Sequence, residues 1–329
     1  MTRREQIAAV ADLGFTERQA GFLVTVLIHA GVCVRRQYCA YAHILRGQKV
    51  HDFFSRLVAR RLMTPYVSAH QGSRLYHIQG KRLYAAIDEP DNRNRRPATL
   101  GRAIERLMLL DSVLGATELR WLGTEKEKVE YFHKATTLRP NELPHLGFGT
   151  PPRQAFRYFP DKLPIGVTAD GRTHVFLYLV NRTAPVDFRA FLHRHVELLR
   201  SLAYWEIRLL VPRHLVKAAP AFEAAAREEL SKPLRLDDVD ELSWFFKQQC
   251  AIEDGAQTDD AARFAHARRR FHEPRFRTLY RMWKKDGSRL VHGTASPVLE
   301  DALARGRGKV ASAVLARSYH HLSHLVGTA

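Results

Sequence analysis

Cysteine and long apolar runs are both scarce in this chain. Its 329 residues include 3 cysteines, Cys33, Cys39 and Cys250, which are too few for a disulfide framework and suit a reducing cytosol. We expect core thiols rather than zinc ligands, because no second cysteine pair completes a metal-binding set. No apolar run is long enough to span a bilayer, and the first residues lack the apolar segment of a signal peptide. These absences predict a cytoplasmic protein without a membrane partner.

Acidic residues are also in short supply. The chain has 52 Lys and Arg against 34 Asp and Glu, a formal net charge of +18. Residues 1–98 hold 16 basic and 7 acidic residues, a net charge of +9, so half of the excess lies in under a third of the chain. Such an excess favours nucleic acid as a partner, although a membrane surface or a solvated surface is also compatible with it. The chain is long enough for two or three domains.

The stretch Arg46–Ile78 has the pattern of a helix followed by two strands. Two short strands are expected from Met63 onward, around a Gly-centred turn at residues 70–73. A helix followed by a two-stranded wing is typical of a winged helix-turn-helix, whose exposed helix face enters a DNA groove. The spacing of apolar residues predicts the buried face of the helix as Val50, Phe53, Phe54, Leu57, Val58 and Leu62.

Two further helices are expected ahead of this stretch. Thr16 and Gln19 form a capping box that begins a helix ended by Gly31, and a short helix fits Arg35–Ala42. Base contacts are predicted for the exposed residues Gln48, Lys49, Asp52 and Arg56. Backbone or minor-groove contacts are predicted for Arg35, Arg36, His70 and Arg74, and Arg46 and Arg60 complete the candidate surface.

The rest of the chain divides into three parts. The Pro-, Asn- and Arg-rich run 89–98 predicts a linker, which either tracks the DNA backbone or is a solvated hinge. The apolar helix Leu100–Leu114 would start the next core or pair with a second copy. Short strands, an Asp170-Gly171 turn and a helix over 186–202 predict an α/β domain. The domains are then 1–90 (winged helix), 91–116 (linker and connecting helix), 117–215 (α/β) and 216–329 (mainly helical).

Four other motifs carry weaker signals. The arginine run 268–270 is either a solvated face or a DNA contact. The run 304–312 lacks the spacing of a phosphate-binding P-loop, so a basic loop is expected there. The spacing of His320 and His324 suits two metal ligands on one helix face, but no third ligand is evident and a helical tail is favoured. His193 and His195 are expected on the surface.

Six segments resemble the plasmid replication-relaxation proteins and related regulators of mobile elements: FTERQ, YHIQGKRLY, LPIGV, HVFLYLVNRT, FRAFLHRHVELL and RLLVP. The resemblance extends from Thr16 to about Pro212, about 60% of the chain. It implies a winged helix coupled to a domain similar to the PD-(D/E)xK restriction-endonuclease fold. The expected fold class is therefore multidomain α+β or α/β: winged helix, nuclease-like α/β domain and helical C-terminal region.

The chain departs from that family at the catalytic positions. A Pro-Asp on one strand and an acidic-x-Lys on the next would hold a divalent ion and activate water. Here the matching residues are Pro164-Ile165 and Tyr178-Leu179-Val180, and neither isoleucine nor valine can take those roles. Asp161 and Asp170 lie nearby in the sequence, which leaves migrated catalytic residues as an alternative to an inactive scaffold.

We therefore expect a sequence-specific binder of double-stranded DNA, acting as a transcriptional regulator of a mobile element, plasmid or defence locus and associated with the nucleoid. A homodimer on a pseudo-palindrome is expected, because one winged helix contacts few base pairs. Two alternatives remain open: a metal-dependent nuclease or nicking factor in plasmid replication or transfer, and a protein-binding adaptor in a DNA-associated complex. No catalytic residue, metal ligand or cofactor is assigned.

Overall fold

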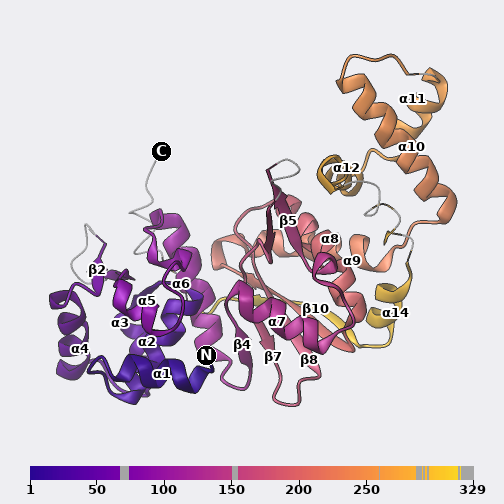
Figure 1. The fold of residues 1–329 in the computed structure, drawn as a ribbon. Coiled ribbons are helices and arrows are strands. Elements are labelled where there is room, and N and C mark those ends of the chain that lie inside the picture. Colours follow the sequence, from indigo (N-terminus) through magenta and orange to yellow (C-terminus); the bar gives the residue numbers. More distant parts are fainter. Residues whose placement is uncertain are drawn as a thin grey trace. The chain divides into compact units, whose positions relative to one another are not determined.

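The computed structural model describes residues 1–66, 74–149, 155–258, 260–286, 291, 293–294, 296–317 and 319, without the side chains of 285 and 286. It is a mixed α+β protein with N-terminal helices around a small antiparallel sheet, a mixed five-stranded sheet and a helical region (Figure 1). Residues 1–124, 163–169 and 315–329 form one compact unit, and residues 125–162 and 170–314 form the second. In the described ranges, no helix combines the length and apolarity needed to cross a membrane.

The first unit begins with helices α1 to α4 and strands β1 to β3. β3 is the middle strand of an antiparallel sheet, paired with β1 in the register Val32↔His77 and with β2 in the register Met63↔Ile78. The three helices expected from the sequence are confirmed, whereas α1 and β1 were not expected. The elements are α1 (Arg3–Ala11), α2 (Glu17–His29), β1 (Val32–Val34), α3 (Arg35–Ala42), α4 (Gln48–Ala59), β2 (Met63–Pro65) and β3 (Leu75–Ile78).

Residues 89–98, expected to be a linker, pack on this unit instead. The 3-10 turn η1 (Arg93–Arg95) buries Asn94, which is 3% exposed. Its Nδ2 donates hydrogen bonds of 3.0 Å to the Leu27 carbonyl and 2.9 Å to the Ile28 carbonyl at the end of α2. Those carbonyls have no partner within their own helix, so Asn94 satisfies groups that would otherwise be costly to bury. The linker prediction was wrong because the run caps a helix.

Two more helices complete the N-terminal part of the first unit. α5 (Lys81–Ala86) packs against α1, and α6 (Leu100–Gly115) packs against α2, α3 and β1. Most apolar residues of α6 are buried, and Leu107 and Leu110 are fully buried. The helix therefore belongs to the core of the first unit and does not start a separate core.

The five-stranded sheet has the order β10-β9-β8-β7-β4. β8, β9 and β10 run parallel, β4 is antiparallel to β7, and β5 and β6 form a separate hairpin. The strands and helices predicted between 117 and 215 are confirmed. The elements are β4 (Arg120–Leu122), α7 (Glu125–Ala135), η2 (Pro140–Glu142), β5 (His145–Phe148), β6 (Ala155–Tyr158), β7 (Ile165–Val167), β8 (Thr173–Leu179), α8 (Val186–Ser201) and β9 (Tyr204–Val211).

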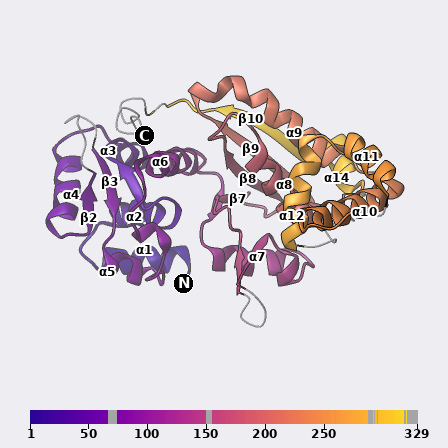
Figure 2. The same ribbon diagram turned by 90° about the horizontal axis from the view of Figure 1, so that it is seen from above.

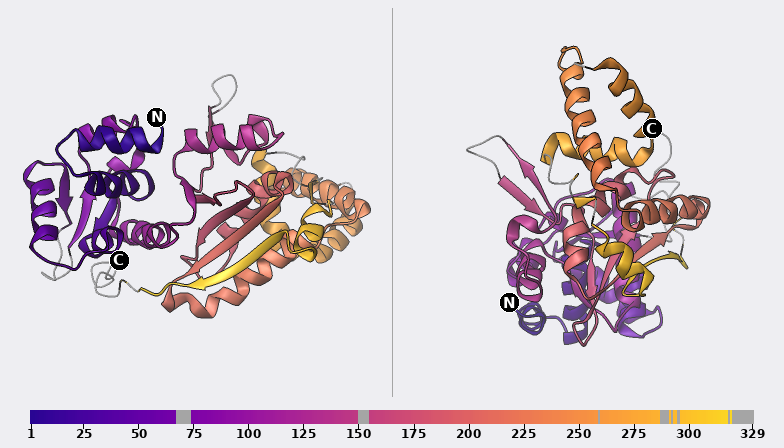
Figure 3. Two further views of the ribbon diagram at one scale, coloured as in Figure 1. Left: turned by 90° about the horizontal axis from the view of Figure 1, so that it is seen from below. Right: turned by 90° about the vertical axis from the view of Figure 1, so that its right-hand side faces the viewer.

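β10 (Gly308–Val314) corrects the basic loop expected at 304–312. The strand lies alongside β9, about a hundred residues earlier in the chain (Figure 3, left), in the register Gly308↔Trp205 to Val314↔Val211. Only glycine fits at 308, because a Cβ there would lie 2.3 Å from Cζ2 of Trp205. The region after residue 215 therefore contributes a strand to the sheet as well as helices.

Helices α7 and α8 cover the same face of β8. Phe176 on β8 has its ring 6.4 Å from that of Phe132 on α7 and 5.8 Å from that of His195 on α8. Tyr178, two residues further on the same face, contacts Phe188 and Phe191 of α8 at 4.6 and 5.2 Å between ring centroids. Figure 2 shows α8 beside β8. Aromatic packing thus fixes both helices on the sheet.

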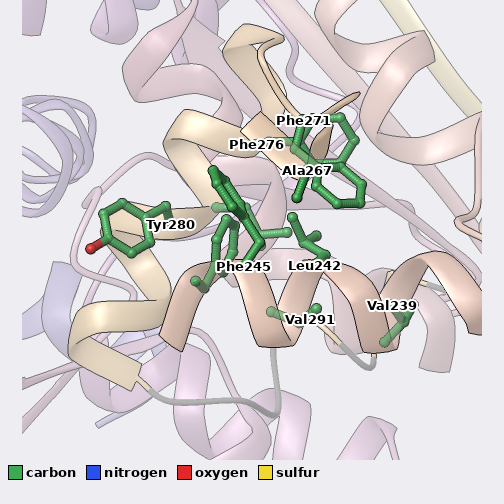
Figure 4. Close-up of a cluster of buried hydrophobic side chains, with 10 residues drawn as sticks. Val239, Leu242, Phe245, Ala267, Phe271, Phe276, Tyr280 and Val291 are labelled. Atoms are coloured by element: carbon green, nitrogen blue, oxygen red, sulfur yellow. The ribbon is translucent and has the colours of Figure 1, made fainter. Parts of the chain in front are cut away.

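The helical region contains a bundle with a core of its own. Apolar side chains of α10, among them Leu242 and Phe245, point toward Phe271 and Phe276 (Figure 4). α10 and α11 lie side by side (Figure 1), and α12 packs on α8, α9 and α10. The elements are η3 (Arg213–Ala218), α9 (Ala219–Ser231), α10 (Leu236–Glu253), α11 (Ala261–Arg270), α12 (Pro274–Asp286) and α14 (Val298–Ala304).

A buried ionic cluster joins α8, α9 and α12. Glu229 on α9 pairs with Arg189, and its Oε2 lies 3.0 Å from His193 Nε2 and 3.2 Å from Arg275 Nε. Burial raises the pKa of Glu229, but His193, Arg275 and Arg189 outweigh burial and leave that pKa below its ordinary value. His193 and His195 are both buried, so their expected place on the surface was wrong. The cluster fixes α12 through Arg275.

Candidate nucleic-acid interface

Helix α4 has one buried and one exposed face. Val50, Phe53, Phe54 and Leu57 are buried as predicted, Leu62 is buried beyond the end of the helix, and Val58 is only half-buried. The ring of Phe53 lies 4.6 Å from that of Tyr38, and the ring of Phe54 lies 4.9 Å from that of Tyr76. These contacts hold the helix on α3 and β3. The exposed face then presents Gln48, Lys49, Asp52, Arg56 and, beyond the helix, Arg60.

Three members of this face, Gln48, Arg56 and Arg60, contact neighbouring side chains. Gln48 Nε2 donates to Asp52 Oδ1 at 2.6 Å, and Arg56 donates to Gln19 Oε1 at 2.7 Å. The guanidinium groups of Arg56 and Arg60 lie 5.4 and 5.1 Å from the centre of the Phe15 ring, within the range of a cation–π contact. Phe15 therefore orients both arginines while leaving them exposed.

Lys49 and Arg46 contribute two further cations to this surface. Both side chains are exposed at the start of α4, and no carboxylate in the described ranges forms an ion pair with either. Arg74 is exposed just before β3. His70, the remaining residue of the candidate surface, lies outside the described residues.

Arg35 and Arg36 are half-buried at the start of α3. Arg36 donates to Asp111 Oδ2 of α6 at 2.9 Å and to the Tyr319 hydroxyl at 2.8 Å. Burial lowers the pKa of Arg36, but the hydrogen bond and charge of Asp111 outweigh it and raise that pKa. Arg35 lies over the rings of Phe54 and Tyr76, at 5.9 and 5.6 Å from their centroids. Both arginines thus brace α3, an anchoring contact that sequence analysis did not anticipate.

A cleft of about 1060 Å³ opens beside α4 and is lined by α2, α3 and α4. Three cations line it, namely Lys49, Arg56 and Arg18, together with Asp52 and Glu17. Arg18 was missing from the sequence-based candidates. The capping box at Thr16 could have identified it, because that box places Arg18 in the exposed first turn of α2. Its NH1 donates to the Ala42 carbonyl at 3.3 Å, which places the guanidinium next to α3.

The positions that the sequence resemblance equates with nuclease catalytic residues carry no acid or lysine and are buried. Ile165, Tyr178 and Val180 are at most 7% exposed. Asp161 pairs with Arg194 of α8, and Asp170 Oδ1 accepts a 3.0 Å hydrogen bond from the Arg172 amide in the turn before β8. Among the described residues, no group of three or more His, Cys, Asp or Glu side chains is arranged to hold a metal ion. The His320 and His324 pair lies outside the described ranges.

No protein-family model, curated protein or solved structure matches this chain.

Proposed function

We propose that this protein is a sequence-specific double-stranded DNA-binding protein that regulates transcription. The observation that carries the proposal is the exposed face of α4, where Gln48, Lys49 and Arg56 project from a helix locked in place by buried aromatic rings. The order α2-β1-α3-α4-β2-β3, with β3 between β1 and β2, is that of a winged helix-turn-helix. The proposed fold of the first unit is therefore a winged helix, with α4 as the recognition helix.

In this mechanism α4 enters the major groove and its side chains contact base edges. Lys49 and Arg56 are suited to guanine and Gln48 to adenine, and each good contact contributes about 1–3 kcal/mol of discrimination. Because Gln19 and Phe15 already orient Arg56, less side-chain freedom is lost on binding. Arg46, Arg18 and Arg74 would contact phosphates, which position the helix without selecting sequence.

The test is selection of bound duplexes from a random-sequence pool, followed by affinity measurements on the selected site and on an unrelated duplex. We expect the double variant Lys49→Ala, Arg56→Ala to reduce the ratio of the two affinities by at least about tenfold, since each contact contributes about 1–3 kcal/mol. Lys81→Ala, Arg82→Ala removes the same charge from exposed residues of α5 and serves as the matched control.

Equal losses of discrimination in the two variants would exclude α4 as the recognition helix. The selected sites also test the proposed homodimer, because a two-fold symmetric dimer selects inverted repeats. Single, unrepeated sites would count against that dimer.

The alternative of a metal-dependent nuclease is favoured by one observation. The elements α6, β4, β7, β8, α8 and β9 occur in this order as helix, three strands, helix and strand, with α7 and the β5–β6 hairpin inserted between β4 and β7, an order similar to that of PD-(D/E)xK nucleases. We propose that this arrangement serves as a scaffold, because Ile165 and Val180 stand at positions where that chemistry needs a carboxylate and a lysine.

Incubation with supercoiled plasmid in Mg²⁺ or Mn²⁺ distinguishes the scaffold from the enzyme. We expect the plasmid to remain supercoiled. Nicked product that disappears in an Asp161→Asn variant would instead assign catalysis to a migrated carboxylate, and the scaffold proposal would be wrong.

A further inference from the structure

The bundle formed by α10, α11 and α12 is electrically polarised. Residues 236–254, which cover α10, contain 6 acidic residues and 1 basic residue. Residues 261–286, which cover α11 and α12, contain 9 basic and 2 acidic residues. Opposite charges on neighbouring helices can pair within the bundle, and only basic side chains outside such pairs are available to an external ligand.

Three of the basic side chains are paired with acids of α10. Arg263 lies 2.7 Å from Glu241 and Lys284 lies 2.9 Å from Glu253, while Arg270 pairs with Asp238. A further four arginines are exposed, and no carboxylate of the described residues forms an ion pair with them. These four define the basic strip: Arg268, Arg269, Arg277 and Arg281.

Local hydrogen bonds hold Arg277 and Arg281 of the basic strip beside the corner between α11 and α12. His272 Nδ1 lies 2.8 Å from the Arg269 carbonyl, and Arg277 Nε donates to the His272 carbonyl at 3.2 Å. Arg281 Nε donates to the Arg277 carbonyl at 3.4 Å, one turn further along α12. Between Arg268 and Arg281, the exposed carboxylate is that of Glu273, in the corner between the two helices. The four exposed arginines therefore follow one another from the end of α11, across the corner at His272, to the second turn of α12.

The opposite face of α12 is anchored, which keeps the basic strip outward. Arg275 is 4% exposed, donates to the Lys232 carbonyl at 2.9 Å and lies 3.2 Å from Glu229. Phe276 and Tyr280 are buried in the core of the bundle. Rotation of α12 would expose these groups, so Arg277 and Arg281 are held toward solvent.

We propose that the basic strip binds the phosphate backbone of double-stranded DNA and gives the protein a second, sequence-independent DNA contact. Arginine is suited to this role because its planar fork matches phosphate oxygens. Single-stranded nucleic acid would need aromatic rings for base stacking, and a membrane surface would need exposed apolar side chains. The described aromatic residues of α12 are buried or half-buried, so neither requirement is met. The inference rests on the proposed binding of duplex DNA through α4.

The test compares two quadruple variants of the full chain. The strip variant carries Arg268→Gln, Arg269→Gln, Arg277→Gln and Arg281→Gln. The control variant carries Lys217→Gln, Lys247→Gln, Arg305→Gln and Arg307→Gln, which removes equal charge from exposed residues of the same unit. Affinities for the selected duplex and for an unrelated duplex are measured between about 50 and 200 mM salt, where phosphate contacts have their largest effect.

We expect the strip variant to bind both duplexes at least about tenfold more weakly, with the ratio of the two affinities unchanged. The slope of log affinity against log salt concentration is negative, and its magnitude should decrease by about 0.9 for each lost phosphate contact. A third variant with lysine at the four strip positions should restore most of the affinity, because it restores the charge. It also shows that the strip positions tolerate substitution.

Four outcomes overturn the inference. Equal losses in the strip and control variants would show an effect of net charge alone. Unchanged DNA affinity in the strip variant, with loss of binding to polyglutamate, would assign the strip to an acidic protein partner. If the unsubstituted chain discriminates between the two duplexes and the strip variant binds them as tightly as the unsubstituted chain does, only this inference fails. If the unsubstituted chain binds no duplex at all, the proposed function fails as well.

Discussion

His195 is enclosed by three phenylalanine rings. Its ring centroid lies 6.2 Å from that of Phe159, 5.8 Å from that of Phe176 and 4.1 Å from that of Phe191. Burial lowers its pKa from 6.5 to about 4, because the charged imidazolium is poorly solvated there. Between these two pH values the unfolded chain binds a proton that the folded chain does not. Acidification through this window therefore favours unfolding.

The resulting prediction concerns stability as a function of pH. Because the folded-state pKa is depressed, the contribution of His195 to the free energy of unfolding should fall as pH drops from 6.5 toward 4, by about 3 kcal/mol at 1.36 kcal/mol per pKa unit. His195→Phe removes this titration and keeps a ring in the cluster. In urea unfolding, the free energy of unfolding of the variant should therefore rise by about 3 kcal/mol relative to that of the unsubstituted chain as the pH falls from 6.5 to 4.

The control for this measurement is His133→Gln, which replaces an exposed histidine of α7. Its unfolding is measured over the same pH range, as a reference for the loss of a histidine elsewhere. A pH-independent difference between His195→Phe and the unsubstituted chain would mean that His195 takes up its proton in the folded chain as readily as in the unfolded one.

At the scale of elements, the sequence predicts those whose pattern is local. α4 and α8 show apolar residues at helical spacing, β8 is a largely apolar run, and β9 alternates buried and half-buried residues before an apolar end, so their positions follow from burial of apolar residues. β10 has only a weak pattern, because most of its residues are half-buried or exposed. What makes it a strand is parallel pairing with β9, a partner far away in the sequence. α1, with Val10 as its buried residue, has too little apolar periodicity to be recognised.

The candidate interface shows the same division between local and distant information. The exposed face of α4 follows from its spacing alone, and Gln48, Lys49, Asp52 and Arg56 are exposed as expected. The partners of this surface depend on tertiary structure, since Arg56 lies over the ring of Phe15, about forty residues before it in the sequence. Asn94 likewise lies in a run whose composition is that of a linker, and only its hydrogen bonds to the end of α2 show otherwise.

At the scale of the whole chain, Tyr319 connects residues from opposite ends of the sequence within the first unit. Its hydroxyl donates to Asp111 Oδ2 at 2.7 Å and accepts from Arg36 at 2.8 Å, across 283 positions in the latter case. Burial, together with the charge of Asp111, raises the pKa of Tyr319, so the hydroxyl keeps its proton and remains a donor. The C-terminal part of the chain thereby stabilises α3, which carries α4.

Tyr319→Phe should lower the free energy of unfolding of the first unit by about 2 kcal/mol, because a hydrogen bond to a charged group typically contributes about 1.5–3 kcal/mol. The loss should appear as faster hydrogen exchange of the α3 amides, since Arg36 and Gln37 both lose a partner. Tyr158→Phe, in the second unit, is the control, because no hydrogen bond of its hydroxyl is present in the described residues. Equal exchange of α3 in both variants would mean that the Tyr319 hydroxyl does not hold α3. A selective loss would show that the last described residue stabilises the helix on which the proposed DNA-contacting surface rests.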